Sequence, residues 1–416
     1  MVRHANLWFD SCPTRREISS GLIKNVDTLI VGGGLAGVSL LYYLINSGMV
    51  NTYLVEESSI GFHASGRGMG QLMLRGTKLF HEMEDGAEYL NFIGDNNRRF
   101  LNGLRTLSFD NDLRETGGLR LAIDEAEMSK LEKESNFIVN ARGIDCPLLS
   151  KEDVESLIPS KRFVGGMFVP NEANFNPYKV VNGLRDAVEK SGSRVFTNTQ
   201  VESVVTNDDG SLTVSIRHRG MIRAKQIVYC TGAYTNRLLP EFADILVPFR
   251  EHIIATDYLD KDMSNLLPAI SISCNDGNER FRSYSTRFII GGMRQSVRGQ
   301  QEGIVYDGEI SPTVYDKLRS FAIESFPFLK PAKFSHIWSS IFCSTKDGKP
   351  LIGPVPGKPN QYMLTGFGCY DTSNVILGSM MIKDYIKNKD SIVSANEILN
   401  PGRFFNALQD QKTNDI

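Results

Sequence analysis

Four glycines between residues 32 and 37, followed by an acidic residue, have the spacing of a site for nucleotide phosphates. Gly32, Gly34 and Gly37 form a Gly-x-Gly-x-x-Gly pattern, and Glu56 follows further along. Gly32 permits a tight turn, Gly34 lets the backbone approach a pyrophosphate, and Gly37 allows a helix to pack closely on a strand. Glu56 is suited to bind the ribose hydroxyls. The pattern predicts an ADP moiety, which belongs to either FAD or NAD.

Two strands and one helix must position these residues. DTLIV (27–31) and TYLVEE (52–57) are typical of buried strands, and residues 37–47 are typical of a helix. Together they predict a strand–helix–strand unit, in which the N-terminus of the helix offers free N–H groups and a partial positive charge to the phosphates. The alternative is a glycine turn that binds no ligand.

Helix and strand patterns alternate along the rest of the chain, without an internal repeat. In the segment LSKEDVESLIP, Ser150 and Asp153 approximate a capping box at the start of a helix. The expected elements are a helical stretch at 77–107, a strand at 116–123, charged helices within 125–158, a helix at 176–192, a β-meander after it, a β-rich stretch at 245–338, and a strand, glycine turn and helix within 360–388.

Composition excludes several functional classes. The 46 Lys and Arg residues nearly balance 48 Asp and Glu residues, for a formal charge of −2, so nucleic acid is not expected as a partner. The apolar run at 35–45 is too short to span a membrane. Residues 1–16 lack the apolar core of a signal peptide, which predicts a cytoplasmic protein. The six cysteines and six histidines show no metal-ligand spacing, so no metal site is expected.

Three later segments favour FAD over NAD. GFHASGRGMGQL (61–72) suits a loop that runs beneath a pyrophosphate and a flat ring, and QIVYCTGAY (226–234) predicts a strand that returns to the same sheet. LTGFGCYDTSNVILGS (364–379) places a glycine turn before a helix whose positive end faces an electron-rich ring edge.

The chain resembles the D-amino-acid oxidase superfamily of FAD-dependent oxidoreductases, and within it the branch of glycine oxidase, sarcosine oxidase and gamma-glutamylputrescine oxidase. The matching segments include DTLIVGGGLAGVSLLYYL, HASGRGMG, TGGLRLAI, NFNPYKVVNGL, VYCTGAYTNRL, STKDGKPLIGPVPG and LTGFG. The resemblance implies an α/β fold with an α+β substrate lobe. A Rossmann-like FAD-binding domain (1–105, 155–244 and 338–416) is interleaved with an antiparallel β-sheet substrate domain (106–154 and 245–337).

The resemblance also implies which residues contact FAD, bound covalently or noncovalently. Some relatives attach the flavin through a cysteine where this chain has Ser340, so a thioether at that place is excluded. Cys343 and His63 are two further candidates for a covalent link to the flavin. The favoured alternatives are that Cys343 is a buried thiol and that His63 is a loop histidine with a local hydrogen bond. The implied FAD contacts are Gly32, Gly34, Leu35, Ala36, Gly37, Glu56, Ala64, Ser65, Gly68, Met69, Gly70, Val201, Gly232, Gly366, Phe367, Gly368 and Thr372.

The substrate residues depart from the pattern of this branch. Amino-acid oxidases of the branch often hold the substrate carboxylate with an arginine where this chain has Phe342. The substrate is therefore either an amine without a carboxylate at that point or an acid held by another arginine. In NERFRSYSTRF, Arg282 and Tyr284 share one face of a predicted strand with Arg280, which makes Arg282 and Tyr284 candidates for substrate binding. The alternative for these arginines is a solvated sheet surface.

Three residues are candidates for a role in catalysis. His252 is placed to assist deprotonation or to orient the substrate, and its alternative role is a structural hydrogen bond. Tyr370 and Asp371 stand where relatives have glycine and histidine, so they are expected to shape the pocket; Asp371 would attract an ammonium group or cap the following helix.

The resulting hypothesis is an FAD-dependent oxidase or dehydrogenase of a small-molecule amine or amino acid. Hydride transfer from the carbon next to nitrogen gives an imine, which water hydrolyses. The alternatives are a non-catalytic flavin-binding subunit of a heteromeric enzyme and an NAD-dependent dehydrogenase. The electron acceptor and the oligomeric state, including a homo-oligomer, stay open.

Overall fold

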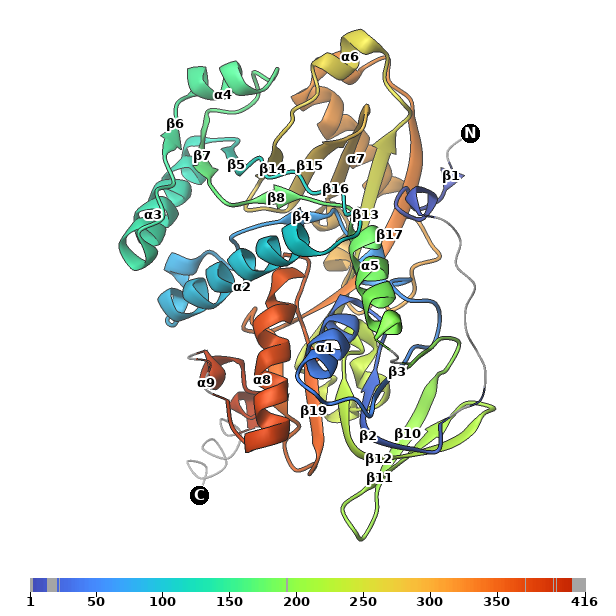
Figure 1. Ribbon diagram of the computed structural model, residues 1–416. Helices are drawn as coiled ribbons and strands as arrows, with labels where there is room; N and C mark the ends of the chain where they lie inside the picture. Colours follow the sequence, from blue (N-terminus) through green and yellow to red (C-terminus); the bar gives the residue numbers. More distant parts are fainter. Residues whose placement is uncertain are drawn as a thin grey trace.

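The computed structural model describes residues 3–405 except 13–20, 22, 192, 193, 371, 392 and 394. Two large β-sheets dominate it, and Figure 1 shows one in the upper part of the view and the other below, beside helices α1, α5 and α8. In the described part of the chain, no helix is both long enough and apolar enough to cross a membrane.

The lower sheet has eight strands and contains the predicted strand–helix–strand unit. Its central strands β12, β2, β3 and β9 run parallel, and β10, β11 and the first half of β12 form the expected antiparallel meander. The main path is β10 (Val201–Thr206), β11 (Leu212–Ile216), β12 (Gly220–Tyr229), β2 (Asn25–Val31), β3 (Thr52–Val55) and β9 (Arg194–Phe196); β19 (Gln361–Thr365) pairs with β12, and β18 (Leu351–Pro354) with β19.

The upper sheet has nine strands and is mostly antiparallel. Its two parallel pairs are β1 with β17 and β5 with β14. The strand order is β1 (Arg3–His4), β17 (Phe334–Thr345), β13 (Leu246–Thr256), β16 (Arg287–Gly292), β15 (Glu279–Tyr284), β14 (Ser271–Cys274), β5 (Gly118–Ala122), β7 (Gly165–Val169) and β6 (Leu148–Leu149). A separate short ribbon joins β4 (Gln71–Leu72) to β8 (Ala173–Asn174).

Helices cover the two sheets. In the lower part α1 packs against α5 and α8, and in the upper part α7 packs against β13 and β16. The helices are α1 (Leu35–Asn46), α2 (Gly86–Thr106), α3 (Glu125–Arg142), α4 (Lys151–Leu157), α5 (Pro177–Lys190), α6 (Lys261–Asn265), α7 (Pro312–Ser325), α8 (Val375–Asn388) and α9 (Asn396–Leu399).

Most predicted elements are confirmed, with differences at their ends. The Ser150–Asp153 capping box is present in full at the start of α4. The helical stretch predicted at 77–107 begins only at Gly86, because a separate 3-10 turn (Phe80–Glu82) precedes it. The division into two domains stays a prediction. Strand β7 and most of β17, which the sequence analysis placed with the FAD-binding segments, pair in the upper sheet.

Candidate functional site

The turn between β2 and α1 is shaped by its glycines. Gly32 has φ +113°, and a Cβ atom there would lie 2.3 Å from the carbonyl oxygen of Cys230. A Cβ atom on Gly37 would lie 1.9 Å from the carbonyl oxygen of Gly32, so only glycine lets α1 pack this closely on the turn. Helix α1 has no side-chain cap at Gly34. Instead, the first-turn N–H of Leu35 donates to Ser65 Oγ at 2.8 Å, so the 64–70 loop bonds directly to the start of α1.

Glu56 lies directly after β3 and beside this turn. One carboxylate oxygen accepts a hydrogen bond from the N–H of Gly33 at 2.6 Å and the other from the N–H of Ser58 at 2.8 Å. Burial raises the pKa of Glu56 and outweighs the stabilisation of its charged form by these two donors. The carboxylate is thus fixed at the end of the strand, where it is able to accept hydrogen bonds from the hydroxyl groups of a ligand.

The loop at residues 64–70 is held from behind by buried side chains. Five consecutive carbonyl oxygens of this loop each accept a hydrogen bond from a side chain that is distant in sequence. Because these donors come from three separate segments, the loop has a fixed path along the cavity that it lines. The bonds run from Asn6 Nδ2 to Gly66 (2.7 Å), Trp338 Nε1 to Arg67 (2.8 Å), Trp8 Nε1 to Gly68 (2.8 Å), and Arg282 Nη1 to Met69 (3.2 Å) and Gly70 (2.5 Å).

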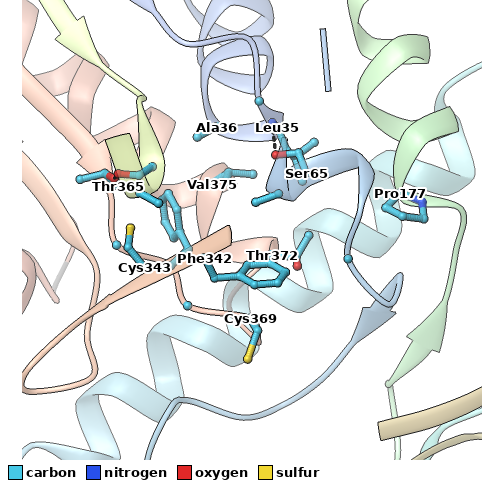
Figure 2. A pocket seen from close by; sticks show the side chains of 18 of the residues that line it. Leu35, Ala36, Ser65, Pro177, Phe342, Cys343, Thr365, Cys369, Thr372 and Val375 are labelled. Carbon is cyan, nitrogen blue, oxygen red and sulfur yellow. Dashed lines mark hydrogen bonds between the residues drawn. The ribbon is translucent and has the colours of Figure 1, made fainter. Parts of the chain in front are cut away.

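Two adjoining cavities meet at the glycine turn. The glycine-turn cavity holds about 1180 Å³ of unfilled space, its open mouth included, and the Phe342 cavity about 870 Å³. They share lining residues that include Gly34, Ser65 and Gly232. Figure 2 shows residues from the start of α1, from β17 and from the 369–375 segment around the Phe342 cavity. The two cavities are therefore neighbouring parts of one space beside the 64–70 loop.

Most residues predicted to contact FAD line these cavities. Gly37 does not, since it serves the packing of α1 on the turn. The predicted residues around the glycine-turn cavity are Gly32, Gly34, Glu56, Ala64, Ser65, Val201 and Gly232; those around the Phe342 cavity are Gly34, Leu35, Ala36, Ala64, Ser65, Gly68, Met69, Gly70, Gly232, Gly366, Phe367, Gly368 and Thr372.

The shape and chemistry of this space fit FAD. Gly232 has φ +53°, and a Cβ atom there would meet no atom within 4 Å, so any side chain would enter open cavity space. The start of α1 at the glycine turn suits the pyrophosphate, and the fixed Glu56 carboxylate suits the ribose. The wall formed by Leu35, Phe342 and other apolar groups suits a flat ring. These residues would therefore hold FAD along the whole length of the space.

Phe342 lines the cavity where the sequence predicted an apolar replacement for an arginine. Its ring stacks on Phe249 with the ring centroids 6.0 Å apart. Among the described residues, Arg280 is the one charged side chain in the lining. Arg280 donates to the buried carboxylate of Glu251 through Nη2 and to the carbonyl oxygen of Cys369 through Nη1 at 3.0 Å. Its charge is thus already balanced inside the protein.

Arg282, Tyr284 and His252, which were predicted to bind the substrate or to take part in catalysis, lie outside the lining of both cavities. Arg282 is buried behind the loop, where Nη1 donates to backbone carbonyls, and burial lowers its pKa to about 9. The hydroxyl of Tyr284 donates to Asp112 at 2.8 Å. The Nε2 atom of buried His252 accepts the N–H of Ser311 at 3.0 Å. Their assignment to substrate or catalysis stays a prediction, and these contacts are those of supporting residues.

The remaining candidates lie close to the cavities. Tyr370 adjoins the Phe342 cavity and donates to the carbonyl oxygen of Gly277 at 2.8 Å, whereas Asp371 lies outside the described residues. Cys343 lines the Phe342 cavity, and burial raises the pKa of its thiol to about 12. His63 lies in the lining of the glycine-turn cavity, with Nδ1 3.3 Å from the Tyr234 hydroxyl. The oxygen of Ser340 is buried.

Gln71 is a polar lining residue that was not predicted from the sequence. Gln71 lines the Phe342 cavity, and its Oε1 atom is buried without a hydrogen-bond partner. Its Nε2 atom donates to Ser271 Oγ at 2.8 Å and to the carbonyl oxygens of Ile272 and Phe281. An amide side chain directly after a glycine-rich loop, within the apolar segment MGQLML, was the available signal.

Known proteins are similar to this chain in sequence and fold. Gamma-glutamylputrescine oxidoreductase of Escherichia coli (strain K12) is 23% identical over 400 residues, which cover 93% of this chain and 90% of that protein. The crystal structure of glycine oxidase from Geobacillus kaustophilus matches with a TM-score of 0.78 and 19% identity over 91% of this chain and 99% of the other. L-proline dehydrogenase from P. horikoshii matches with a TM-score of 0.79 and 17% identity, over 93% and 99%.

A family model decides between the two nucleotides that the glycine pattern left open. The model of the FAD dependent oxidoreductases, DAO, matches residues 27–380, which include the glycine turn, Glu56, the 64–70 loop and the 366–372 turn. NAD is therefore not the nucleotide that this site serves. The chain belongs to the DAO family of FAD-dependent oxidoreductases, and its cofactor is FAD.

Proposed function

We propose that this protein oxidises the C–N bond of an amine that has no carboxylate on the reacting carbon. The observation that carries this proposal is the wall of the Phe342 cavity. Phe342 presents an apolar ring, and the one charged side chain of the described lining, Arg280, is paired with Glu251. Of the two alternatives that Phe342 left open, this wall favours an amine over an acid held by another arginine.

The Arg280–Glu251 pair is a poor site for a substrate carboxylate. Both side chains are almost fully buried, at 2% and 4% exposure. A substrate carboxylate would have to displace Glu251, and breaking a buried ion pair costs about 3–5 kcal/mol when one charge is left without a partner. Arg282 is equally occupied, since it donates to the carbonyls of Met69 and Gly70.

Gln71 supports the amine as the group that is recognised. Its Nε2 atom is held by acceptors on the upper sheet, which fixes the direction of the carbonyl half of the amide. The free Oε1 atom is an acceptor for an N–H of the substrate. An amine that donates to Gln71 would satisfy a buried oxygen that otherwise lacks a partner.

Among the described residues that line the Phe342 cavity, no side chain is suited to take a proton near neutral pH. Burial raises the pKa of Cys343 and of Cys369 to about 12, so both are thiols, and Arg280 is a cation. The amine therefore has to arrive uncharged, and the apolar wall at Phe342 favours that form because it disfavours charge. Bound FAD supplies the acceptor for the hydride from the carbon next to nitrogen.

Anaerobic reduction of the bound flavin tests the proposal. Paired compounds that differ by one carboxylate, such as ethylamine and alanine or dimethylamine and sarcosine, are mixed with the holoenzyme while flavin absorbance is followed. We expect the amine of each pair to reduce the flavin at least tenfold faster, with a rate that rises with pH as the amine loses its proton. Gln71→Leu should lower the rate for amines about tenfold, while the bound flavin content is unchanged.

Two results would count against the proposal in different ways. Faster reduction by the carboxylated member of each pair would mean that an arginine does hold a substrate carboxylate. If dithionite bleaches the flavin but no compound of a broad panel of amines and amino acids does, the chain is a non-catalytic flavin-binding subunit.

A further inference from the structure

A third, polar cavity adjoins the Phe342 cavity. It contains about 820 Å³ of unfilled space, its open mouth included, and shares Gly368 and Cys369 with the Phe342 cavity. We call it the Arg75 cavity, because Arg75 is its most deeply buried cation. A molecule that reacts at the Phe342 wall therefore has a second, chemically different space beside it.

Arg75 is buried without a carboxylate partner. Arg75 is 3% exposed. Among the described residues, no carboxylate oxygen lies within 4.0 Å of its guanidinium nitrogens. Nη2 donates to the backbone carbonyl of Asp276, and the buried Nε atom has no hydrogen-bond partner. A buried guanidinium of this kind normally has an anion, because its charge is costly to bury alone.

The other charges of the Arg75 cavity are largely paired. Lys130 Nζ lies 2.7 Å from the Asp276 carboxylate, and Glu251 is bound by Arg280. Arg294, a further lining cation, pairs with Glu302 at 3.3 Å. Lys78 and Glu82 are exposed at the mouth. Among the described residues, Arg75 is thus the buried cation of this cavity that has no carboxylate at ion-pair distance. Glu172, a buried carboxylate that interacts electrostatically with Arg75, is itself paired with Arg120 at 3.2 Å.

Tyr370 connects the two cavities. Its ring lies 5.3 Å from the guanidinium carbon of Arg75 and 5.1 Å from that of Arg280. Arg280 lines the Phe342 cavity, while Tyr370 and Arg75 line the third one. Both guanidinium groups therefore lie close to one aromatic ring, at the junction of the reaction space and the polar space.

We infer that the Arg75 cavity binds an anionic group at the far end of an elongated amine substrate, with Arg75 as its principal ligand and Lys78 at the mouth. This inference rests on the proposed function, because it places the reacting amine at Phe342 and Gln71. It narrows the substrate class to amines with a remote carboxylate, for which a guanidinium is a suitable bidentate partner. It also explains why Phe342 stands where relatives often have an arginine. In this protein the substrate carboxylate is recognised away from the reacting carbon, so no arginine is needed at that position.

Two measurements on the holoenzyme separate this inference from the proposed function. The first is calorimetric titration with glutarate, a dicarboxylate that has no amine and therefore reports on the anion site alone. The second compares anaerobic flavin reduction by 4-aminobutyrate and by butylamine, which have the same carbon chain with and without the remote carboxylate. We expect glutarate to bind and 4-aminobutyrate to reduce the flavin at least tenfold more efficiently.

Variants identify the residue responsible. Arg75→Gln should raise the glutarate dissociation constant at least tenfold and remove the advantage of 4-aminobutyrate, while butylamine reacts as before; Arg75→Lys should keep part of the binding. Because Arg75 is buried, Lys78→Gln at the exposed mouth serves as a second variant, with an expected loss of about threefold. Arg98→Gln, on an exposed arginine of α2 that pairs with Asp95, removes the same charge elsewhere and should change neither measurement.

The outcomes are distinguishable. Unchanged glutarate binding in both Arg75→Gln and Lys78→Gln overturns the anion site, even if amines reduce the flavin. Reduction by no amine, together with glutarate binding that depends on Arg75, overturns the proposed function and leaves the anion site standing. Equal efficiency of 4-aminobutyrate and butylamine in the wild-type protein would show that the Arg75 cavity does not select the substrate.

Discussion

His252 illustrates how burial decides the role of a single residue. It lies in β13, fully buried, and its Nε2 atom accepts the N–H of Ser311. Burial, with a contribution from Arg250, lowers the pKa of His252 from 6.5 to about 4. The imidazole is therefore neutral at pH 7, in the form that accepts the hydrogen bond, and it lies outside the lining of both FAD cavities.

This depressed pKa predicts a specific dependence of stability on pH. The pKa of His252 is lower in the folded than in the unfolded protein, so neutral His252 contributes to the free energy of unfolding above about pH 6.5. This contribution, on the order of 3 kcal/mol in total, is lost as the pH falls towards 4. His252→Gln keeps an acceptor but does not titrate. We expect the melting temperature of the wild-type protein to fall relative to that of the variant between pH 7 and pH 4.

The same variant tests the catalytic role considered for His252. The rate of flavin reduction by an amine should be within threefold of wild type, and its pH profile should keep its shape between pH 6 and 9. A pH profile that loses one ionisation in His252→Gln would contradict the supporting role and return His252 to the reaction.

The arginines show what a sequence pattern leaves undetermined at this scale. Alternation along the strand correctly grouped Arg280 and Arg282 on one face of β15. It could not reveal that Arg280 meets Glu251, 29 positions away, or that Arg282 meets the backbone carbonyls of Met69 and Gly70. These partners come from β13 and from the 64–70 loop, so they exist only after the upper sheet is assembled and the loop packs against it.

At the scale of elements, the 64–70 loop depends on donors from outside its own segment. Trp8, Trp338 and Arg282 bind its carbonyls from the N-terminal segment, β17 and β15. The two tryptophans belong to a largely apolar cluster that also includes Met69, and the guanidinium carbon of Arg282 lies 5.5 Å from the centroid of the Trp8 ring. The 64–70 loop, which lines both cavities, is thus held in place by the N-terminal segment and the upper sheet.

Trp8→Phe tests this support. The substitution keeps an aromatic ring but removes the Nε1–H that donates to Gly68 at 2.8 Å, which leaves a carbonyl of the loop without its partner. An unsatisfied group costs about 1–3 kcal/mol when it is buried, and the lower end of this range applies here because the bond to Gly68 is partly buried. We expect the FAD dissociation constant, measured by fluorescence of released flavin, to rise about tenfold.

Tyr284→Phe is the matched control. The Tyr284 ring packs edge-on against Trp8 at 4.9 Å, but its hydroxyl donates to Asp112 and not to the loop. This variant should lose stability without losing FAD affinity. An equal loss of affinity in both variants would mean that general packing around Trp8, and not the bond to Gly68, holds the loop.

The elements closest to the glycines were the most predictable from sequence. The turn, α1 and Glu56 follow from a local pattern in which each residue has one physical task, and the structure confirms the packing role of Gly37. The start of α2 at Gly86 was less predictable, because the 3-10 turn before it is fixed by contacts of Phe80 and His81 N–H groups with Glu134, far along the chain.

At the scale of the whole molecule, the FAD space joins the two sheets. The glycine-turn cavity is lined mainly by the lower sheet and its connections, whereas the Phe342 cavity also contains Ile341, Phe342 and Cys343 of β17 in the upper sheet. Bound FAD would therefore contact both parts. The amount of stability that it adds depends on its concentration relative to its dissociation constant.

Removal of FAD should lower the melting temperature and loosen both sides of this space. At a free FAD concentration 100 times the dissociation constant, the expected stabilisation is about 2.7 kcal/mol. ADP, which reproduces only the nucleotide half, is the comparison ligand. In hydrogen exchange we expect ADP to protect residues 31–36 of the glycine turn, and FAD to protect these and the 366–368 turn of the Phe342 cavity as well. Equal protection of 366–368 by ADP and by FAD would mean that the nucleotide half alone orders the whole space, and that the Phe342 cavity does not hold the flavin ring.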